Sequence, residues 1–118
     1  MTPQELKDRT KAFAIRIVKM FRALPRETDA QVIGKQVLRS GTSVGANYRA
    51  ACRARSHAEF MAKMGVVVEE ADETVYWLEL LAETQSVKPE RLHQIRNEAE
   101  QQTAIFTAAK ETARHNRN

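Results

Sequence analysis

Four stretches of the sequence repeat apolar residues every three or four positions, which is the spacing of one face of an amphipathic α-helix. We expect helices over about residues 3–24, 28–53, 57–82 and 89–113. Because short connections join them, the pattern predicts an all-α fold, an antiparallel up-and-down four-helix bundle. The residues expected to face its core are Phe13, Ile17, Phe21, Val37, Val44, Phe60, Met64, Ala71, Val75, Leu78, Leu92, Ile95 and Phe106.

Helix start signals precede these stretches. Thr2 followed by Pro3 is typical of an N-cap residue and the first helical position. Thr28 and Ser56 are each followed three residues later by Gln or Glu, which is the capping-box pattern. Pro89 stands where the last helix can begin. The sequence therefore predicts four helix N-termini close to these residues.

Length and composition are those of one small domain without disulfides. A chain of 118 residues predicts a single domain, residues 1–118. The lone cysteine, Cys52, cannot form an internal disulfide, and its place beside the apolar face of the second helix predicts a packed thiol. The sequence begins without an apolar leader, and its longest apolar run is far too short to span a bilayer. These features predict a cytoplasmic protein with no membrane partner.

Charge is distributed unevenly behind the net value of +4. Residues 9–55 carry eleven Lys and Arg against two acids, whereas residues 64–100 carry three basic residues against nine acids. Two explanations remain open. The basic half binds a polyanion such as RNA, or it docks on the acidic surface of another copy of the chain.

Two of the predicted helices carry apolar residues outside their core faces. Ile15 and Val18 lie opposite the core stripe of the first helix, among basic residues. A second stripe on the third helix includes Tyr76 and the only Trp, although a bundle helix needs one apolar face. Scattered surface hydrophobes are ordinary, but aromatics at this spacing favour a subunit contact. The predicted oligomer interface comprises Ile15, Val18, Arg22, Val66, Glu69, Glu73, Trp77 and Leu80.

The second predicted helix carries a cationic ridge within about 80° of its circumference. Either this ridge binds nucleic acid or it is a solvated helix face. A strip of small polar residues lies between the ridge and the apolar face, and for this strip close helix packing is favoured over phosphate binding. The ridge, which is the candidate nucleic-acid site, consists of Lys35, Arg39, Arg49 and Arg53, and the strip consists of Gln36, Ser40, Ser43 and Asn47.

Catalytic and metal-binding patterns are incomplete. Glu90 and His93 match one Glu-x-x-His element of di-iron bundles, but those sites need two such elements and two further carboxylates. Leu92 is expected inside the bundle, which turns His93 outward. The sequence has no nucleophile–base set, phosphate-binding glycine loop or zinc spacing. It therefore predicts no catalytic residue, no metal and no cofactor, and a protein that is not an enzyme.

Three segments carry a family resemblance: Leu38–Arg49 (LRSGTSVGANYR), Ala54–Phe60 and Glu69–Leu81. They resemble the bacterial four-helix-bundle proteins linked to 23S ribosomal RNA intervening sequences, and the resemblance covers most of the chain. Many members carry a Glu soon after the Asn of the first segment, where this chain has Ala50 and Ala51. The resemblance implies a ring, typically a homopentamer. It also implies a distant relation to the basic accessory barrels of diversity-generating retroelements, which bind nucleic acid and a reverse transcriptase.

These patterns together predict a non-catalytic bundle that assembles with itself and binds RNA or another nucleic acid through helices 1 and 2. The ring is expected to use a heterologous contact, between unlike faces of neighbouring copies. The alternative is a structural adaptor whose partner is a protein, without nucleic-acid binding. A salt-dependent titration with nucleic acid separates the two hypotheses.

Overall fold

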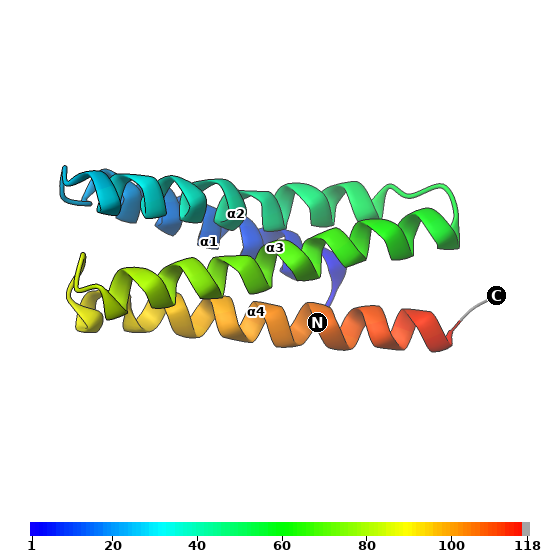
Figure 1. The fold of residues 1–118 in the computed structure, drawn as a ribbon. Helices are drawn as coiled ribbons and strands as arrows, with labels where there is room; N and C mark the ends of the chain where they lie inside the picture. The colour runs from blue at the N-terminus through cyan, green and yellow to red at the C-terminus, as the bar shows by residue number, and fades with distance from the viewer. Residues whose placement is uncertain (117–118) are drawn as a thin grey trace.

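Four antiparallel α-helices make up the computed structural model, which describes residues 1–116 (Figure 1). The helices are α1 (Pro3–Arg22), α2 (Thr28–Cys52), α3 (His57–Glu83) and α4 (Pro89–His115). The bundle measures 50 × 20 × 19 Å. Among the helix pairs that touch, α1 and α4 share the fewest contacts, so this pair forms the least packed edge of the bundle. The predicted all-α four-helix bundle is confirmed.

Capping hydrogen bonds explain where two of the helices begin, and a proline marks the start of a third. The Thr2 hydroxyl accepts the backbone N–H of Glu5 at 3.1 Å, and the Ser56 hydroxyl accepts that of Glu59 at the same distance. Each bond satisfies an N–H that has no partner within its own helix. Pro89 is the first residue of α4. These three predicted start signals are confirmed.

No helix within residues 1–116 has the length and apolar character needed to cross a membrane.

The start of α2 differs from the prediction, which made Thr28 the N-cap. Thr28 is instead the first helical residue, Glu27 precedes the helix, and no side chain caps it. The expected capping partner, Gln31, donates its side-chain amide to the carbonyl of Pro25 at 2.8 Å. The amide therefore fastens the α1–α2 connection and is not free to reach back to the helix N-terminus.

Two apolar clusters fill the bundle, with a polar layer between them. Ten of the thirteen predicted core residues are buried, while Phe21, Phe60 and Val75 are partly buried and pack against the clusters. Each helix contributes one buried polar residue at the boundary: Thr10, Ser40, Thr74 and Gln102. Buried polar groups need partners at fixed positions, so we infer that this layer helps to set the alignment of the helices along the bundle.

Two glycines of α2 allow α1 to approach closely. A Cβ added at Gly41 would lie 2.9 Å from Ile17, and one at Gly45 would lie 3.0 Å from the Thr10 hydroxyl. Side-chain atoms on α1 occupy that space. Glycine lowers helix propensity, but at these positions it permits the close α1–α2 contact that larger residues would prevent. The apolar face of α2 therefore continues through both glycines as one helix.

Phe106 provides a test of the core. Its side chain is fully buried, and its ring lies 5.1 Å from that of Tyr48. We expect Phe106→Ala to lower the free energy of unfolding by about 3–5 kcal/mol, because it removes apolar contacts and leaves a cavity. Phe60→Ala should cost clearly less, because Phe60 is only partly buried. Urea denaturation of both variants measures the difference, and equal costs would contradict this assignment of the core.

Candidate nucleic-acid and subunit interfaces

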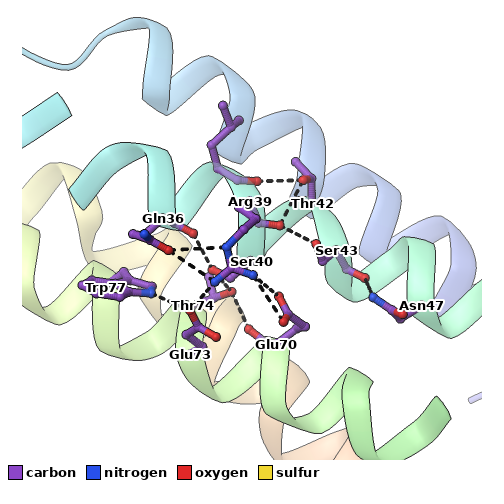
Figure 2. Close-up of polar contacts among 11 residues, drawn as sticks. Gln36, Arg39, Ser40, Thr42, Ser43, Asn47, Glu70, Glu73, Thr74 and Trp77 are labelled. Atoms are coloured by element: carbon purple, nitrogen blue, oxygen red, sulfur yellow. Dashed lines mark hydrogen bonds and ion pairs between the residues drawn. The ribbon is translucent and has the colours of Figure 1, made fainter. Parts of the chain in front are cut away.

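Arg39, from the predicted ridge on α2, is already paired with the acidic face of α3 (Figure 2). Its guanidinium forms ion pairs with Glu70, at 3.2 Å, and with Glu73. Glu73 also accepts the indole N–H of Trp77 at 3.0 Å. The Arg39 side chain is 49% exposed, so the pairs contribute little to stability. They nevertheless compensate the charge of Arg39 inside the chain, which the sequence of α2 alone did not reveal.

The strip of small polar residues on α2 is used for packing within the bundle. The Thr74 hydroxyl donates to the Ser40 hydroxyl at 2.9 Å, which links α3 to α2 in the buried polar layer. Ser40, Ser43 and Asn47 each donate to the carbonyl four residues earlier (Figure 2). Since these side-chain donors are engaged locally, the packing interpretation is supported over phosphate binding.

A groove between α1 and α2 brings Arg49 of the ridge next to two lysines. The groove has a volume of about 200 Å³. It is lined by Lys7, Thr10, Lys11, Ala14, Thr42, Gly45, Ala46 and Arg49. No carboxylate lines it, and its three cations take part in no ion pair within the described residues. The two threonine hydroxyls donate to carbonyls of their own helices. The groove therefore offers uncompensated positive charge above a floor of small residues.

The remaining ridge cations, Lys35 and Arg53, are exposed. Neither forms an ion pair with another described residue. Three of the four predicted nucleic-acid-binding residues thus keep an uncompensated charge, and Arg39 does not. Lys7 and Lys11 were missed as ridge neighbours because their place beside Arg49 depends on how α1 packs on α2.

An ion pair closes part of the sparsely packed α1–α4 edge. Arg9 of α1 lies 2.7 Å from Glu98 of α4 and also donates to Gln101 at 2.8 Å. The hydrogen bond from Arg9 is the main reason that the pKa of Glu98 is lowered, with further contributions from Gln102 and Arg16. Gln102 donates its amide to Glu98 at 2.8 Å, while its buried oxygen has no hydrogen-bond partner among residues 1–116. This edge therefore depends on polar contacts.

The exposed part of the predicted subunit interface is smaller than the sequence suggested. Ile15 is 47% exposed and Val66 is 39% exposed, whereas Val18 is partly buried. Arg22 and Glu69 are exposed. These five side chains can meet another molecule without any rearrangement of the bundle.

The other predicted interface residues on α3 contribute to the fold of their own chain. Glu73, Trp77 and Leu80 are partly buried, and Trp77 packs against an apolar cluster. The ring of Tyr76 meets Trp77 edge-on at 4.9 Å and is itself 55% exposed. The exposed apolar side chains that α3 presents are therefore those of Val66, three residues before Glu69, and Tyr76, seven residues after it.

Candidate catalytic residues do not gather into a site. Leu92 is buried and His93 is exposed, as expected. Within residues 1–116, no group of three or more His, Cys, Asp or Glu side chains is arranged to hold a metal ion. The predicted packed thiol is wrong: Cys52 is exposed, because the buried face of α2 ends with Ala51 and Cys52 is the last residue of the helix. Burial raises the pKa of the nearby Tyr48 phenol, and a hydrogen bond with Cys52 raises it further.

The protein is a small all-α bundle with a basic flank on α1 and α2. This flank consists of Lys7, Lys11, Lys35, Arg49 and Arg53. The sequence matches the 23S rRNA-intervening sequence protein family over residues 4–108, and the chain belongs to that family. It is similar to a crystal structure described as a protein of unknown function from the S23 ribosomal protein family of Bacteroides thetaiotaomicron. The two are 39% identical with a TM-score of 0.86, covering 94% of this chain and 99% of that chain. None of the curated proteins matches. Neither description names an enzymatic activity.

Proposed function

We propose that this protein is a non-catalytic, self-assembling bundle that binds the phosphate backbone of RNA through the basic flank of α1 and α2. The observation that carries the proposal is the α1–α2 groove, where Lys7, Lys11 and Arg49 converge without a carboxylate. Exposed cations that lack internal partners are the groups that replace counterions along a nucleic acid. The family description refers to 23S rRNA intervening sequences and does not itself name a binding partner.

Contacts to phosphate fit this surface better than contacts to bases. The groove residues are Lys, Arg, Ala, Gly and Thr, and the threonine hydroxyls are already bonded within their helices. Little remains that can read base edges, whereas lysine and arginine serve as phosphate contacts. Binding is therefore expected to tolerate changes of RNA sequence. A ring would repeat the groove in every subunit, and linked sites gain affinity when one strand reaches several of them.

A salt titration tests the proposal. We expect a fluorescent single-stranded RNA of random sequence to bind at low ionic strength and to dissociate as NaCl rises. The logarithm of the association constant should fall linearly with the logarithm of salt concentration, by about 0.7 for each phosphate contact. Fluorescence anisotropy measures this slope from roughly 25 to 300 mM NaCl, the range over which such contacts weaken. RNA that fails to bind even at the lowest salt would contradict the proposal.

The alternative, an adaptor for a protein partner, is favoured by a different observation. Tyr76 is 55% exposed and Val66 is 39% exposed on the acidic helix α3. Exposed aromatic side chains are enriched at protein interfaces. If RNA does not bind and these side chains prove essential for an association with another protein, the adaptor replaces the nucleic-acid proposal.

A further inference from the structure

A second groove lies on the other side of α1, where this helix passes the first turns of α4. Its volume is about 440 Å³, within the range of about 300–1,000 Å³ that is usual for small-molecule sites. It is lined by Arg16, Lys19, Met20, Glu90, Arg91, His93, Gln94 and Ile95. The groove shares no residue with the α1–α2 groove. It is therefore a separate feature of the surface.

Positive side chains face this groove from both helices. Arg16 and Lys19 come from α1 and Arg91 comes from α4, together with the imidazole of His93 and the carboxylate of Glu90. All five side chains are exposed. In the described part of the chain, none of the three permanent cations forms an ion pair. Like charges are thus set across the least packed edge of the bundle, and positive charge exceeds negative charge among the residues that line the groove.

We propose that this groove binds a ligand that carries two or more linked phosphate groups. Arg16 and Arg91 present planar guanidinium groups from opposite walls, and such groups bind phosphate oxygens in pairs. Lys19 adds a compact positive charge, and the Gln94 amide adds a hydrogen-bond donor. A single phosphate cannot compensate cations on both walls as fully as a chain of phosphates can. The ligand is either a free polyphosphate or successive phosphates of a nucleic acid.

Phosphate binding has a consequence for the stability of the bundle. Without an anion, the cations of α1 repel those of α4 at an edge that few contacts hold together. An anion between the two walls replaces this repulsion by attraction, and it binds the folded chain alone because only folding brings the walls together. A ligand of this kind raises the melting temperature. The ion pair between Arg9 and Glu98 lies on the same edge and remains intact.

Thermal unfolding with inorganic tripolyphosphate tests the inference. We expect the melting temperature of the protein to rise by about 4 °C or more when tripolyphosphate reaches ten times its dissociation constant. Reference samples contain NaCl at the same ionic strength. The double variant Arg16→Gln, Arg91→Gln should lose most of this rise, because each wall loses its guanidinium. Isothermal titration calorimetry should show the corresponding loss of tripolyphosphate binding.

A matched control separates the groove from general charge effects. The double variant Arg26→Gln, Arg55→Gln removes the same net charge at exposed residues that do not line the groove, and it should keep the full rise. Lys19→Gln provides a milder test of the same groove in case the double variant does not fold, and it should weaken tripolyphosphate binding at least about threefold. The inference is overturned if tripolyphosphate stabilises the protein no more than NaCl does, or if both double variants lose the rise equally.

A comparison of RNA with tripolyphosphate identifies the source of the phosphates. A short single-stranded RNA that gives the same Arg16- and Arg91-dependent rise assigns the groove to the nucleic-acid backbone. A rise with tripolyphosphate but not with RNA assigns it to a free polyphosphate. Because the proposed function depends on Lys7, Lys11 and Arg49, RNA binding that survives Arg16→Gln, Arg91→Gln leaves that function intact. If the wild-type protein binds no RNA but its melting temperature still rises with tripolyphosphate, the proposed function is contradicted and this inference is not.

Discussion

A Lys7→Glu, Arg49→Glu variant is expected to lose at least about tenfold in affinity for single-stranded RNA at 50 mM salt. Both side chains line the α1–α2 groove, and neither has an ion-pair partner within the described residues. Reversal removes two phosphate contacts and adds two repulsive charges. The slope of the salt dependence should shrink by about 1.4, which corresponds to two contacts on a single strand. Fluorescence anisotropy across a salt series measures both quantities.

The matched control for this variant is Lys63→Glu, Lys110→Glu. It makes the same change of net charge on α3 and α4, away from the groove, and should bind RNA nearly as well as the wild type does. If both variants lose affinity equally, RNA responds to overall charge and the groove is not the site. Arg39→Glu would be a poor choice, because it would place a third carboxylate beside Glu70 and Glu73 and disturb the fold itself.

The sequence was sufficient to predict the helices and most of the core, because helical periodicity and caps are local. Ser56 and Pro89 begin their helices as expected. Thr28 is the first residue of α2 and not its N-cap, and Gln31 bonds to the Pro25 carbonyl across the preceding turn. Cys52 was placed one position beside the core face, but the buried face of α2 ends with Ala51, and Cys52, the last residue of the helix, is exposed. Periodicity predicts the direction in which a side chain points, but not how far along a helix the core continues.

The candidate sites were predicted less completely, because they depend on which helix edges meet. Four cations aligned on α2 by their spacing alone, yet Arg39 faces the acids of α3 while Arg49 faces the lysines of α1. His93 and Arg16 lie far apart in the sequence, and only the α1–α4 edge unites them in one groove. The single Trp, which composition favoured as an interface residue, is partly buried and packs on the core of its own chain.

The variant Tyr76→Glu is expected to be a monomer, in contrast to the oligomer that we expect of the wild type. Self-assembly itself remains a prediction. Tyr76 is 55% exposed, seven residues after Glu69, and α1 of a neighbouring copy can present Ile15 among Lys11, Lys19 and other basic residues. Basic and acidic faces of this kind are complementary. The substitution removes the aromatic ring that would pack on Ile15, and the carboxylate that replaces it loses its hydration if this surface is the contact, which costs several kcal/mol, roughly, at each interface. In a ring that cost recurs at every contact.

Light scattering at about tens of micromolar protein, a concentration suited to moderate affinities, measures the oligomeric state. Circular dichroism measures the helix content of the same samples. Val32→Glu is the matched control, because Val32 is 57% exposed on α2 and lies outside the predicted interface. We expect Tyr76→Glu to be monomeric and fully helical, and Val32→Glu to remain assembled. Trp77→Glu would be less informative, since Trp77 packs against the core and its loss affects folding. A wild type that is itself monomeric would exclude the ring, whose number of five subunits follows from the family resemblance alone.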